Sequence, residues 1–130
     1  MNNKLAILAP LLLAASVSAC VTPLVQAPAA PEGSSVGINQ PVVVGRLYAT
    51  PEAVSEDSRC PENALCIWAG QLIVNTQIDG SGWRETTPLT LGVPYSTHGT
   101  SITLVSGLPE KRTDQETQPS DYRFAYQGGR

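Results

Sequence analysis

The chain has 130 residues, enough for one small domain with a single hydrophobic core. Its 8 Lys and Arg residues are outnumbered by 11 Asp and Glu residues, which gives a formal net charge of −3. The basic residues are scattered, and Lys111-Arg112 is the only adjacent basic pair near the end of the chain. Because phosphate binding requires grouped Lys and Arg residues, this pattern argues against nucleic acid as a partner.

The N-terminus has the pattern of an export signal. Residues 5–17 form an apolar run of 13 residues, which is too short to cross a bilayer. Residues 17–20, Val-Ser-Ala-Cys, resemble the lipobox of bacterial lipoproteins. The resemblance implies that residues 1–19 are a signal peptide, that the chain is cut before Cys20, and that the Cys20 Sγ carries a diacylglyceryl group. The lipid anchor would make a membrane one partner of the protein.

Two other interpretations of this segment stay open, namely an ordinary secretory signal cut after Ala19 and an uncleaved membrane anchor. If Cys20 is acylated, each buried CH₂ group contributes about 0.8 kcal/mol, so several acyl chains hold the protein firmly on its membrane. Val21 rather than Asp follows the cysteine. By the sorting rule of enteric bacteria, this resemblance implies the outer membrane of the bacterial cell envelope.

Residues 20–35 are predicted to be a flexible tether behind the lipidated cysteine. Pro23, Pro28 and Pro31 lie within it, and Glu32 is its only charged residue. Segments rich in Pro and Ala favour extended conformations of about 3 Å per residue, so the tether would hold the following domain off the membrane surface. Residues 36–130 are predicted to form that domain.

Apolar and polar residues alternate with period two through most of the domain, which is typical of β-strands. The last such segment places Tyr122, Phe124 and Tyr126 on one face. The predicted strands lie within residues 40–50, 66–78, 83–91, 95–97, 100–105 and 121–127. Six to seven short strands predict an all-β fold, either a small antiparallel β-sandwich without immunoglobulin topology or a partly closed barrel.

Cys60 and Cys66 are predicted to form a disulfide. Once Cys20 is acylated, they are the only cysteines left, and they lie in an oxidising compartment. Closing so short a ring contributes about 2 kcal/mol through chain entropy. A closed structural metal site needs four Cys or His ligands, and His98 is the only histidine, so no metal is expected.

One motif is too particular to follow from composition. It runs Asp-Ser-Arg-Cys-Pro over residues 57–61 and, after four variable residues, Cys-Ile-Trp-Ala-Gly over residues 66–70. It resembles a motif of small exported bacterial proteins, often lipoproteins, to which no biochemical activity is assigned. Residues 119–124 resemble the end of the same domain, so the likeness covers most of residues 36–127. The resemblance implies a family and no activity.

Two interpretations of this motif compete. In the first, the disulfide pins an irregular loop to a long strand, and Trp68 packs inward on the same face as Cys66. In the second, Asp57, Arg59 and Trp68 form a recognition loop, because a rigid loop loses little entropy on binding. The second interpretation expects Arg59→Ala to leave stability nearly unchanged. The first is favoured, because local bridges in small secreted domains usually act as staples.

The sequence offers little material for catalysis, and no catalytic residue or cofactor is assigned. His98 precedes Gly99 at a predicted tight turn, where it would lack the packed orienting partner that a triad base requires. Four acidic residues lie within 11 positions, but their spacing matches no calcium loop and is typical of a solvated acidic loop. They are Glu52, Glu56, Asp57 and Glu62.

These observations favour a lipid-anchored binding or structural module, with an envelope protein as its expected partner. The alternative hypothesis is a small inhibitor of an envelope or foreign hydrolase, for which the size, the compartment and a rigid loop are suitable. An enzyme ranks third, because the chain shows no recognisable catalytic set.

Overall fold

The computed structural model describes residue 10, residues 15–20 and residues 28–130. Most of the predicted signal peptide, residues 1–19, and residues 21–27 of the predicted tether lie outside the described residues. Within the described part, no helix is long and apolar enough to cross a membrane. Apart from one short 3-10 helix, η1 (Pro119–Asp121), the regular structure of the described part is β-strand, as the sequence predicts.

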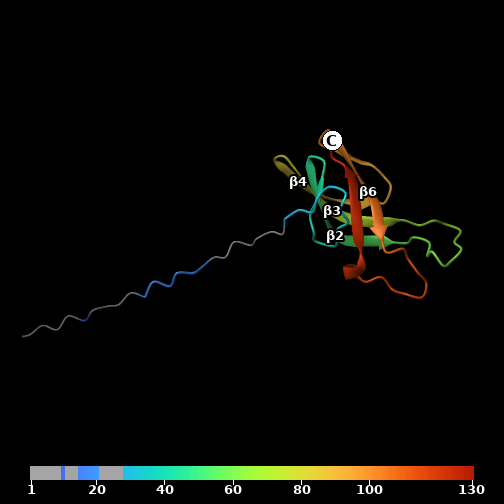
Figure 1. Ribbon diagram of the computed structural model, residues 1–130, viewed down its shortest axis with the longest axis horizontal. Helices are drawn as coiled ribbons and strands as arrows, with labels where there is room; N and C mark the ends of the chain where they lie inside the picture. The colour runs from blue at the N-terminus through green and yellow to red at the C-terminus, as the bar shows by residue number, and fades with distance from the viewer. Residues whose placement is uncertain (1–9, 11–14, 21–27) are drawn as a thin grey trace, which may run out of the picture.

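Seven strands of the described chain form two antiparallel sheets that pack as a small β-sandwich (Figure 1). The four-stranded sheet has the order β1-β2-β3-β4, and the three-stranded sheet has the order β5-β6-β7. The strands are β1 (Val42–Val44), β2 (Leu47–Asp57), β3 (Leu72–Gly80), β4 (Trp83–Thr90), β5 (Tyr95–Thr97), β6 (Thr100–Leu108) and β7 (Arg123–Gly128). The described strands do not close into a barrel, so the sandwich alternative is the one confirmed.

The core lies between the two sheets and consists of the inward faces of the strands. β3 alternates buried and half-buried positions along its length, and β7 buries Phe124 and Tyr126 opposite it, as the alternation predicts. One hydrogen bond crosses this core: the hydroxyl groups of Thr76 and Tyr126 lie 3.0 Å apart. Thr76 is fully buried, and the Tyr126 hydroxyl and the Val74 carbonyl oxygen satisfy the hydrogen bonding of its hydroxyl group.

The turn between β5 and β6 confirms the predicted turn chemistry. His98 and Gly99 both have positive φ, 47° and 75°, in the turn between β5 and β6. The His98 ring is exposed and stacks on the ring of Trp83 with the centroids 3.8 Å apart. In the turn between β3 and β4, a Cβ atom on Gly80 would overlap the Trp83 ring, so glycine is needed there for space.

The prediction of a single strand over residues 40–50 is wrong. Residues 40–50 form a hairpin rather than one strand, because Gly45 turns the chain with a φ of 60° between β1 and β2. β2 continues to Asp57. Its pairing with β3 shifts register twice, between Pro51 and Ala53 and between Val54 and Glu56. Such bulges interrupt the period-two pattern from which strands are predicted. The pattern therefore does not reveal the second half of β2.

The prediction of a long strand over residues 66–78 is also wrong for its first part, residues 66–71. The ladder between β2 and β3 starts only at the pair Asp57 and Leu72, and residues 66–71 lie outside it. Gly70 adopts a φ of 67°, and a Cβ atom there would overlap the backbone of Ser58. The chain therefore turns at Gly70, and the alternation of side chains that holds for β3 does not extend back to Cys66.

Contacts of the domain begin before residue 36. The backbone of Ala30 bonds to that of Pro41 (2.8 Å) and Val43 (2.9 Å), and Ala30 forms a parallel bridge with Val42. Val36 forms an antiparallel bridge with Phe124 of β7. The end of the predicted tether is thus attached beside β1, at the start of the sandwich.

Candidate functional site

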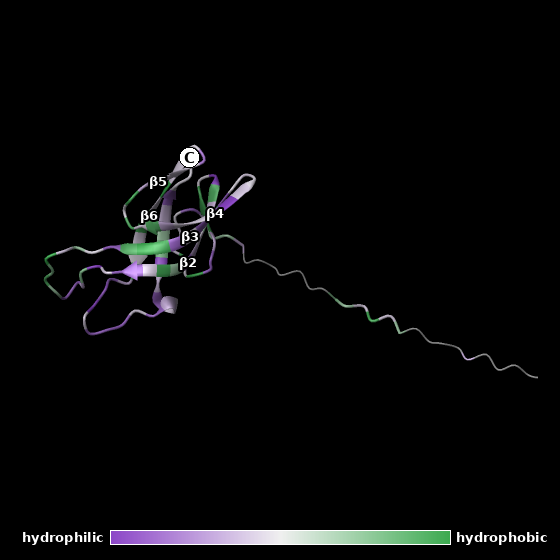
Figure 2. Ribbon diagram, turned by 180° about the vertical axis from the view of Figure 1, so that it is seen from behind, coloured by the Kyte–Doolittle hydropathy of each residue, from purple (hydrophilic) through white to green (hydrophobic). Residues whose placement is uncertain are grey.

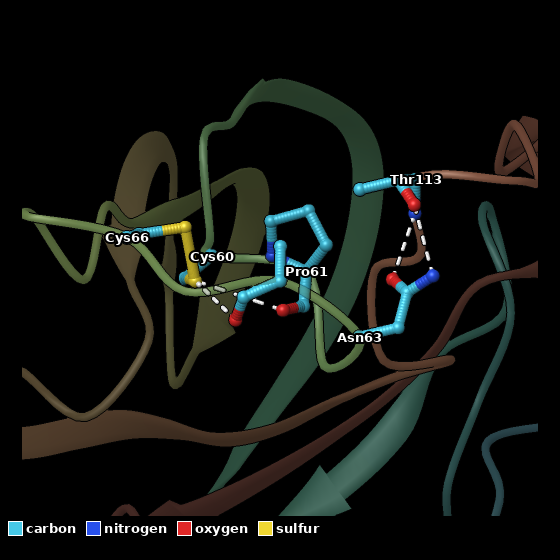
Figure 3. Close-up of a disulfide and its surroundings, with 6 residues drawn as sticks. Cys60, Pro61, Asn63, Cys66 and Thr113 are labelled. Atoms are coloured by element: carbon cyan, nitrogen blue, oxygen red, sulfur yellow. Dashed lines mark hydrogen bonds between the residues drawn. A yellow bond between two sulfur atoms is a disulfide. The ribbon is translucent and has the colours of Figure 1, made fainter.

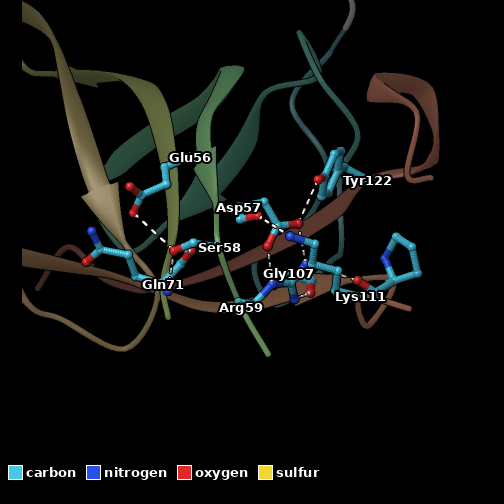
Figure 4. Close-up of polar contacts among 9 residues, drawn as sticks. Glu56, Asp57, Ser58, Arg59, Gln71, Gly107, Lys111 and Tyr122 are labelled. Carbon is cyan, nitrogen blue, oxygen red and sulfur yellow. Dashed lines mark hydrogen bonds and ion pairs between the residues drawn. The ribbon is translucent and has the colours of Figure 1, made fainter. Parts of the chain in front are cut away.

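A largely buried ion pair lies at the end of β2 (Figure 4). The Arg59 guanidinium donates from Nε to Asp57 Oδ1 (2.8 Å) and from Nη2 to Asp57 Oδ2 (2.9 Å). The two side chains are only 11% and 10% exposed. Because a bidentate, desolvated pair of this kind is among the stronger charge-assisted contacts, it holds the chain rigidly where β2 ends.

The same guanidinium reaches the other sheet. Arg59 donates from Nη1 to the carbonyl oxygen of Gly107 (2.7 Å), at the end of β6, and from Nη2 to that of Pro109 (3.1 Å). The Arg59 side chain therefore donates four hydrogen bonds, two to Asp57 and two toward the second sheet. Arginine is required for this arrangement, because its planar group presents several donors in fixed directions.

Two further residues complete what we call the Asp57 network, which consists of Asp57, Arg59, Lys111 and Tyr122. The Tyr122 hydroxyl, just before β7, donates to Asp57 Oδ2 (2.7 Å). Lys111 Nζ donates to the backbone oxygen of Asp57 (2.7 Å). The network thus joins the end of β2 to three points on or beside the three-stranded sheet.

The network changes the acidity of its members. Burial raises the pKa of the Asp57 carboxyl, but the hydrogen bonds from Arg59 and Tyr122 lower it by more, and the resulting pKa is below its usual value. Burial and the hydrogen bond to Asp57 raise the pKa of Tyr122 to about 12. Asp57 is therefore an ionised acceptor and Tyr122 a neutral donor across the ordinary pH range.

The predicted disulfide between Cys60 and Cys66 is confirmed, and it closes a loop beyond the ends of β2 and β3 (Figure 3). Below it, the backbone N–H of Cys60 donates to the carbonyl oxygen of Ala69 (2.9 Å). Ser58 and Gln71 pair at the base of the loop through Ser58 N to Gln71 O (2.9 Å) and Gln71 N to Ser58 Oγ (3.0 Å). These bonds restrain both arms of the loop.

Polar residues of the loop are tied back to the segment that follows β6. Asn63 Nδ2 donates to Thr113 Oγ1 (2.9 Å), and the Thr113 N–H donates to Asn63 Oδ1 (3.0 Å) (Figure 3). The Glu62 carboxylate accepts from Arg112 Nη1 (2.7 Å), and the Glu62 N–H donates to the carbonyl oxygen of Lys111 (2.8 Å). The polar half of the loop is thus held on the domain.

No residue that the structure describes covers the apolar half of the loop. Leu65 is fully exposed, and Ile67 and Trp68 are 93% and 82% exposed. We call these three residues the apolar tip; in Figure 2 the loop that carries them projects from one end of the sandwich and includes hydrophobic colouring. Covering a large aliphatic side chain contributes about 1.5–3 kcal/mol, and clusters of such residues on a surface mark interaction sites.

The inward packing predicted for Trp68 is wrong. The prediction extended the alternation of β3 back to Cys66, but the turn at Gly70 separates Trp68 from the ladder, and its ring lies in solvent. Leu65 and Ile67 were not singled out at all. A signal for both is Gly70, because a glycine at the end of the motif indicates a turn that separates the preceding residues from the strand.

The structure separates the residues that the recognition interpretation grouped. Asp57 and Arg59 are bonded within the network, and little of their side-chain surface is exposed. Trp68, in contrast, lies on the exposed tip. A recognition surface on this loop would therefore consist of Trp68 with Leu65 and Ile67 rather than of Arg59. The clamp interpretation describes Asp57, Arg59 and the disulfide, and it does not describe Trp68.

The remaining candidate residues are dispersed. Of the four acidic residues, Asp57 is bound to Arg59 and Glu62 to Arg112, while Glu52 and Glu56 point to solvent. Among the described residues, no group of three or more His, Cys, Asp and Glu side chains is placed to hold a metal ion. His98 Nδ1 lies 2.8 Å from the Thr97 hydroxyl, which also donates to the Glu85 carboxylate, and the His98 side chain is exposed in its turn.

Comparisons with known proteins add no relative: no protein-family model matches the chain, and no curated protein or solved structure is similar enough to count as a match. The chemistry of the site is therefore that of its own residues. The described surface presents a convex apolar tip on a cross-linked loop, an arrangement suited to binding.

Replacing Arg59 tests the network. We expect Arg59→Ala to lower the free energy of unfolding by about 3 kcal/mol, because it leaves the buried Asp57 carboxylate without its partner. Urea unfolding followed by fluorescence measures this change. Arg84→Ala is the matched control: Arg84 pairs with Asp79 but is 61% exposed, so its loss should cost less than about 1 kcal/mol. An Arg59→Ala variant as stable as the parent would contradict the network's role.

The lowered pKa of Asp57 predicts how stability depends on pH. The ionised carboxylate stabilises the folded state above the unfolded pKa of about 3.9, and this contribution is lost as pH falls through the lower folded pKa. Asp57→Asn should be less stable than the parent at pH 7, and the gap in melting temperature should narrow as pH falls below about 4. The exposed control Glu52→Gln should show no such convergence. A gap that stays constant with pH would refute the assignment.

Proposed function

We propose that this protein is a lipid-anchored binding module of the bacterial cell envelope and that the apolar tip is its recognition element. The observation that carries the proposal is the near-complete exposure of Leu65, Ile67 and Trp68 on a loop that a disulfide and several hydrogen bonds restrain. Large apolar side chains that gain nothing in the folded monomer point to a surface that covers them in the bound state.

Restraint of the loop makes the tip effective in binding. A flexible loop loses conformational entropy when it is bound, whereas a loop already held by the disulfide and by its ties to residues 111–113 loses little. Tryptophan is also among the residues that most often dominate binding energy at interfaces. The Asp57 network supports this function indirectly, because it fixes the base from which the loop projects.

The anchor is supported by the N-terminal pattern. Cys20 follows small residues at the end of the apolar run, and its thiol is exposed and unpaired while the other two cysteines are bonded to each other. By resemblance to the lipobox, Cys20 is acylated and Val21 directs the protein to the outer membrane. Anchoring would concentrate the tip at one surface of the envelope.

A second candidate function is inhibition of an envelope or foreign hydrolase. The observation that favours it is the form of the loop, which projects from the end of the sandwich in both views and is cross-linked at its base (Figures 1 and 2). A restrained projecting loop can occupy an enzyme cleft at little entropic cost. A stoichiometric and saturable loss of a hydrolase's activity on adding the protein would select this function over a non-inhibitory contact.

Fractionation of the envelope tests the anchor. We expect the parent protein in the outer-membrane fraction and Cys20→Ser in the soluble fraction, because a serine hydroxyl cannot take the thioether-linked lipid. Mass spectrometry of the parent should show the acyl chains on Cys20. Recovery of Cys20→Ser in the membrane fraction would refute anchoring at this residue.

Photo-crosslinking in living cells tests the tip. A photoreactive amino acid at position 67 should give a discrete adduct, either with a protein or with a lipid, because Ile67 would lie inside the bound surface. The matched control is the same amino acid at Val93, which is 54% exposed but lies in the connection between β4 and β5. Adding Leu65→Ser and Trp68→Ser should abolish the adduct. Equal labelling from position 93, or none from position 67, would count against the tip as the recognition element.

A further inference from the structure

We propose that the apolar tip inserts into a zwitterionic lipid bilayer, so that the protein touches its membrane at two points, the acylated Cys20 and the disulfide-bridged loop. This inference deepens the proposed function and rests on the anchoring at Cys20. It commits the recognition element to a lipid surface rather than to a protein groove. Its basis is the distribution of polarity in the loop, the balance of charge beside it, and the reach of the chain between the two contact points.

The loop separates its polar residues from its apolar residues. Glu62 and Asn63 are held back on the domain by Arg112 and Thr113. Leu65, Ile67 and Trp68, the next large side chains along the chain, project into solvent with almost their whole surface. A tip of this form can enter the boundary between headgroups and acyl chains, which lies about 5–10 Å deep, without carrying polar side chains with it.

Insertion of the apolar tip takes no charged side chain of its own out of water. Glu62 is the only charged residue from Cys60 to Gly70, and its carboxylate is held back by Arg112 at 2.7 Å, a guanidinium that also pairs with Asp114 at 3.0 Å. At the base of the loop, the charge of Asp57 is neutralised by Arg59. The penalty that keeps carboxylates out of apolar surroundings therefore does not oppose the entry of the apolar tip itself, while the carboxylates of residues 110–116 stay in water.

The charge of the whole chain selects the kind of lipid. A net charge of −3 without a basic cluster offers no attraction to anionic headgroups, which bind proteins through grouped Lys and Arg residues. Binding through the apolar tip alone is expected on zwitterionic lipids and is opposed on anionic ones. Trp68 suits the contact, because the indole ring is amphipathic and is enriched at the headgroup level of membranes.

The chain is long enough for both contacts to form on one bilayer. Ten peptide units separate Cys20 from Ala30, which covalent geometry limits to about 35 Å. Ala30 lies beside Val42, opposite Ala49, and β2 covers about 26 Å from Ala49 to Asp57 at about 3.3 Å per residue. These lengths are comparable, so an anchored domain can tilt until its far end meets the membrane.

Anchoring also makes a small contact sufficient. The chain joins the sandwich at one end and the tip projects from the other, as Figure 1 shows. With Cys20 in the bilayer, insertion of the tip becomes an intramolecular step at high effective concentration. Three apolar side chains on a restrained loop can then hold the domain against the surface, although they would bind weakly from free solution.

Fluorescence of Trp68 in reconstituted vesicles tests the inference. The lipidated protein carrying Trp83→Phe, which leaves Trp68 as its only tryptophan, is purified in detergent. It is then placed in vesicles of phosphatidylcholine and phosphatidylethanolamine that contain brominated lipids. We expect bromine near the headgroup end of the acyl chains to quench Trp68 more than bromine at the methyl end. Quenching by aqueous iodide should fall, and the emission maximum should shift to shorter wavelength.

Two variants make the measurement specific. Leu65→Ser with Ile67→Ser should return Trp68 to water, with loss of bromine quenching and recovery of iodide quenching, and it should keep the parent melting temperature because both side chains are exposed. Val93→Ser with Val105→Ser removes two exposed apolar residues elsewhere and should leave the signal unchanged. A Trp68 that stays open to iodide and insensitive to bromolipids in the parent overturns the inference.

The failure of this inference is distinguishable from the failure of the proposed function. A protein adduct from position 67 in cells, with no bromine quenching, overturns lipid insertion and leaves a binding module whose partner is a protein. Neither adduct nor quenching overturns both proposals. Recovery of Cys20→Ser in the membrane fraction with bromine quenching intact would overturn the two-point attachment.

Discussion

The ion pair between Asp57 and Arg59 is the contact on which the arrangement of this end of the molecule depends. The sandwich core stops near Leu72, where the ladder between β2 and β3 starts, and no sheet packing extends beyond it. The pair occupies that boundary, and the remaining donors of Arg59 reach the end of β6. Because the charges are largely withdrawn from water, each must keep its partner, so the pair specifies one position for the chain between the sheets.

The conspicuous motif can be understood as a platform for the apolar tip. Ser58 pairs with Gln71 at the base, Arg59 binds across to the second sheet, the disulfide closes the loop, and Gly70 provides the positive φ at which the chain returns toward β3. None of these groups needs to touch a partner. They hold the loop in one conformation, and a restrained loop can bind through few side chains.

Under the proposed function, stability and binding depend on different chemistry in this domain. The core buries aliphatic and aromatic side chains between the sheets, with one hydroxyl pair, Thr76 and Tyr126, satisfied inside it. The loop relies on charge, backbone bonds and a disulfide, and it leaves its own apolar residues unused. Trp68 adds little to the packing of the core, and the proposed binding function accounts for its exposure.

The sequence by itself determined the all-β class, the disulfide, the turn at His98 and Gly99, and the burial of Phe124 and Tyr126. These features depend on local rules, because period two sets the faces of a strand, positive φ selects turn residues, and two cysteines six residues apart lie near enough to pair. Each of them needs information from a few neighbouring residues only.

Only the tertiary structure decided which residues of the motif are buried and which are exposed. Arg59 is withdrawn from solvent because carbonyl groups 48 and 50 residues further along the chain come within reach of its guanidinium. Trp68 is exposed because the turn at Gly70 ends the strand pattern before reaching it. A pattern along the chain cannot show either result, since the first depends on partners distant in sequence and the second on a backbone turn held by the Ser58 backbone opposite it.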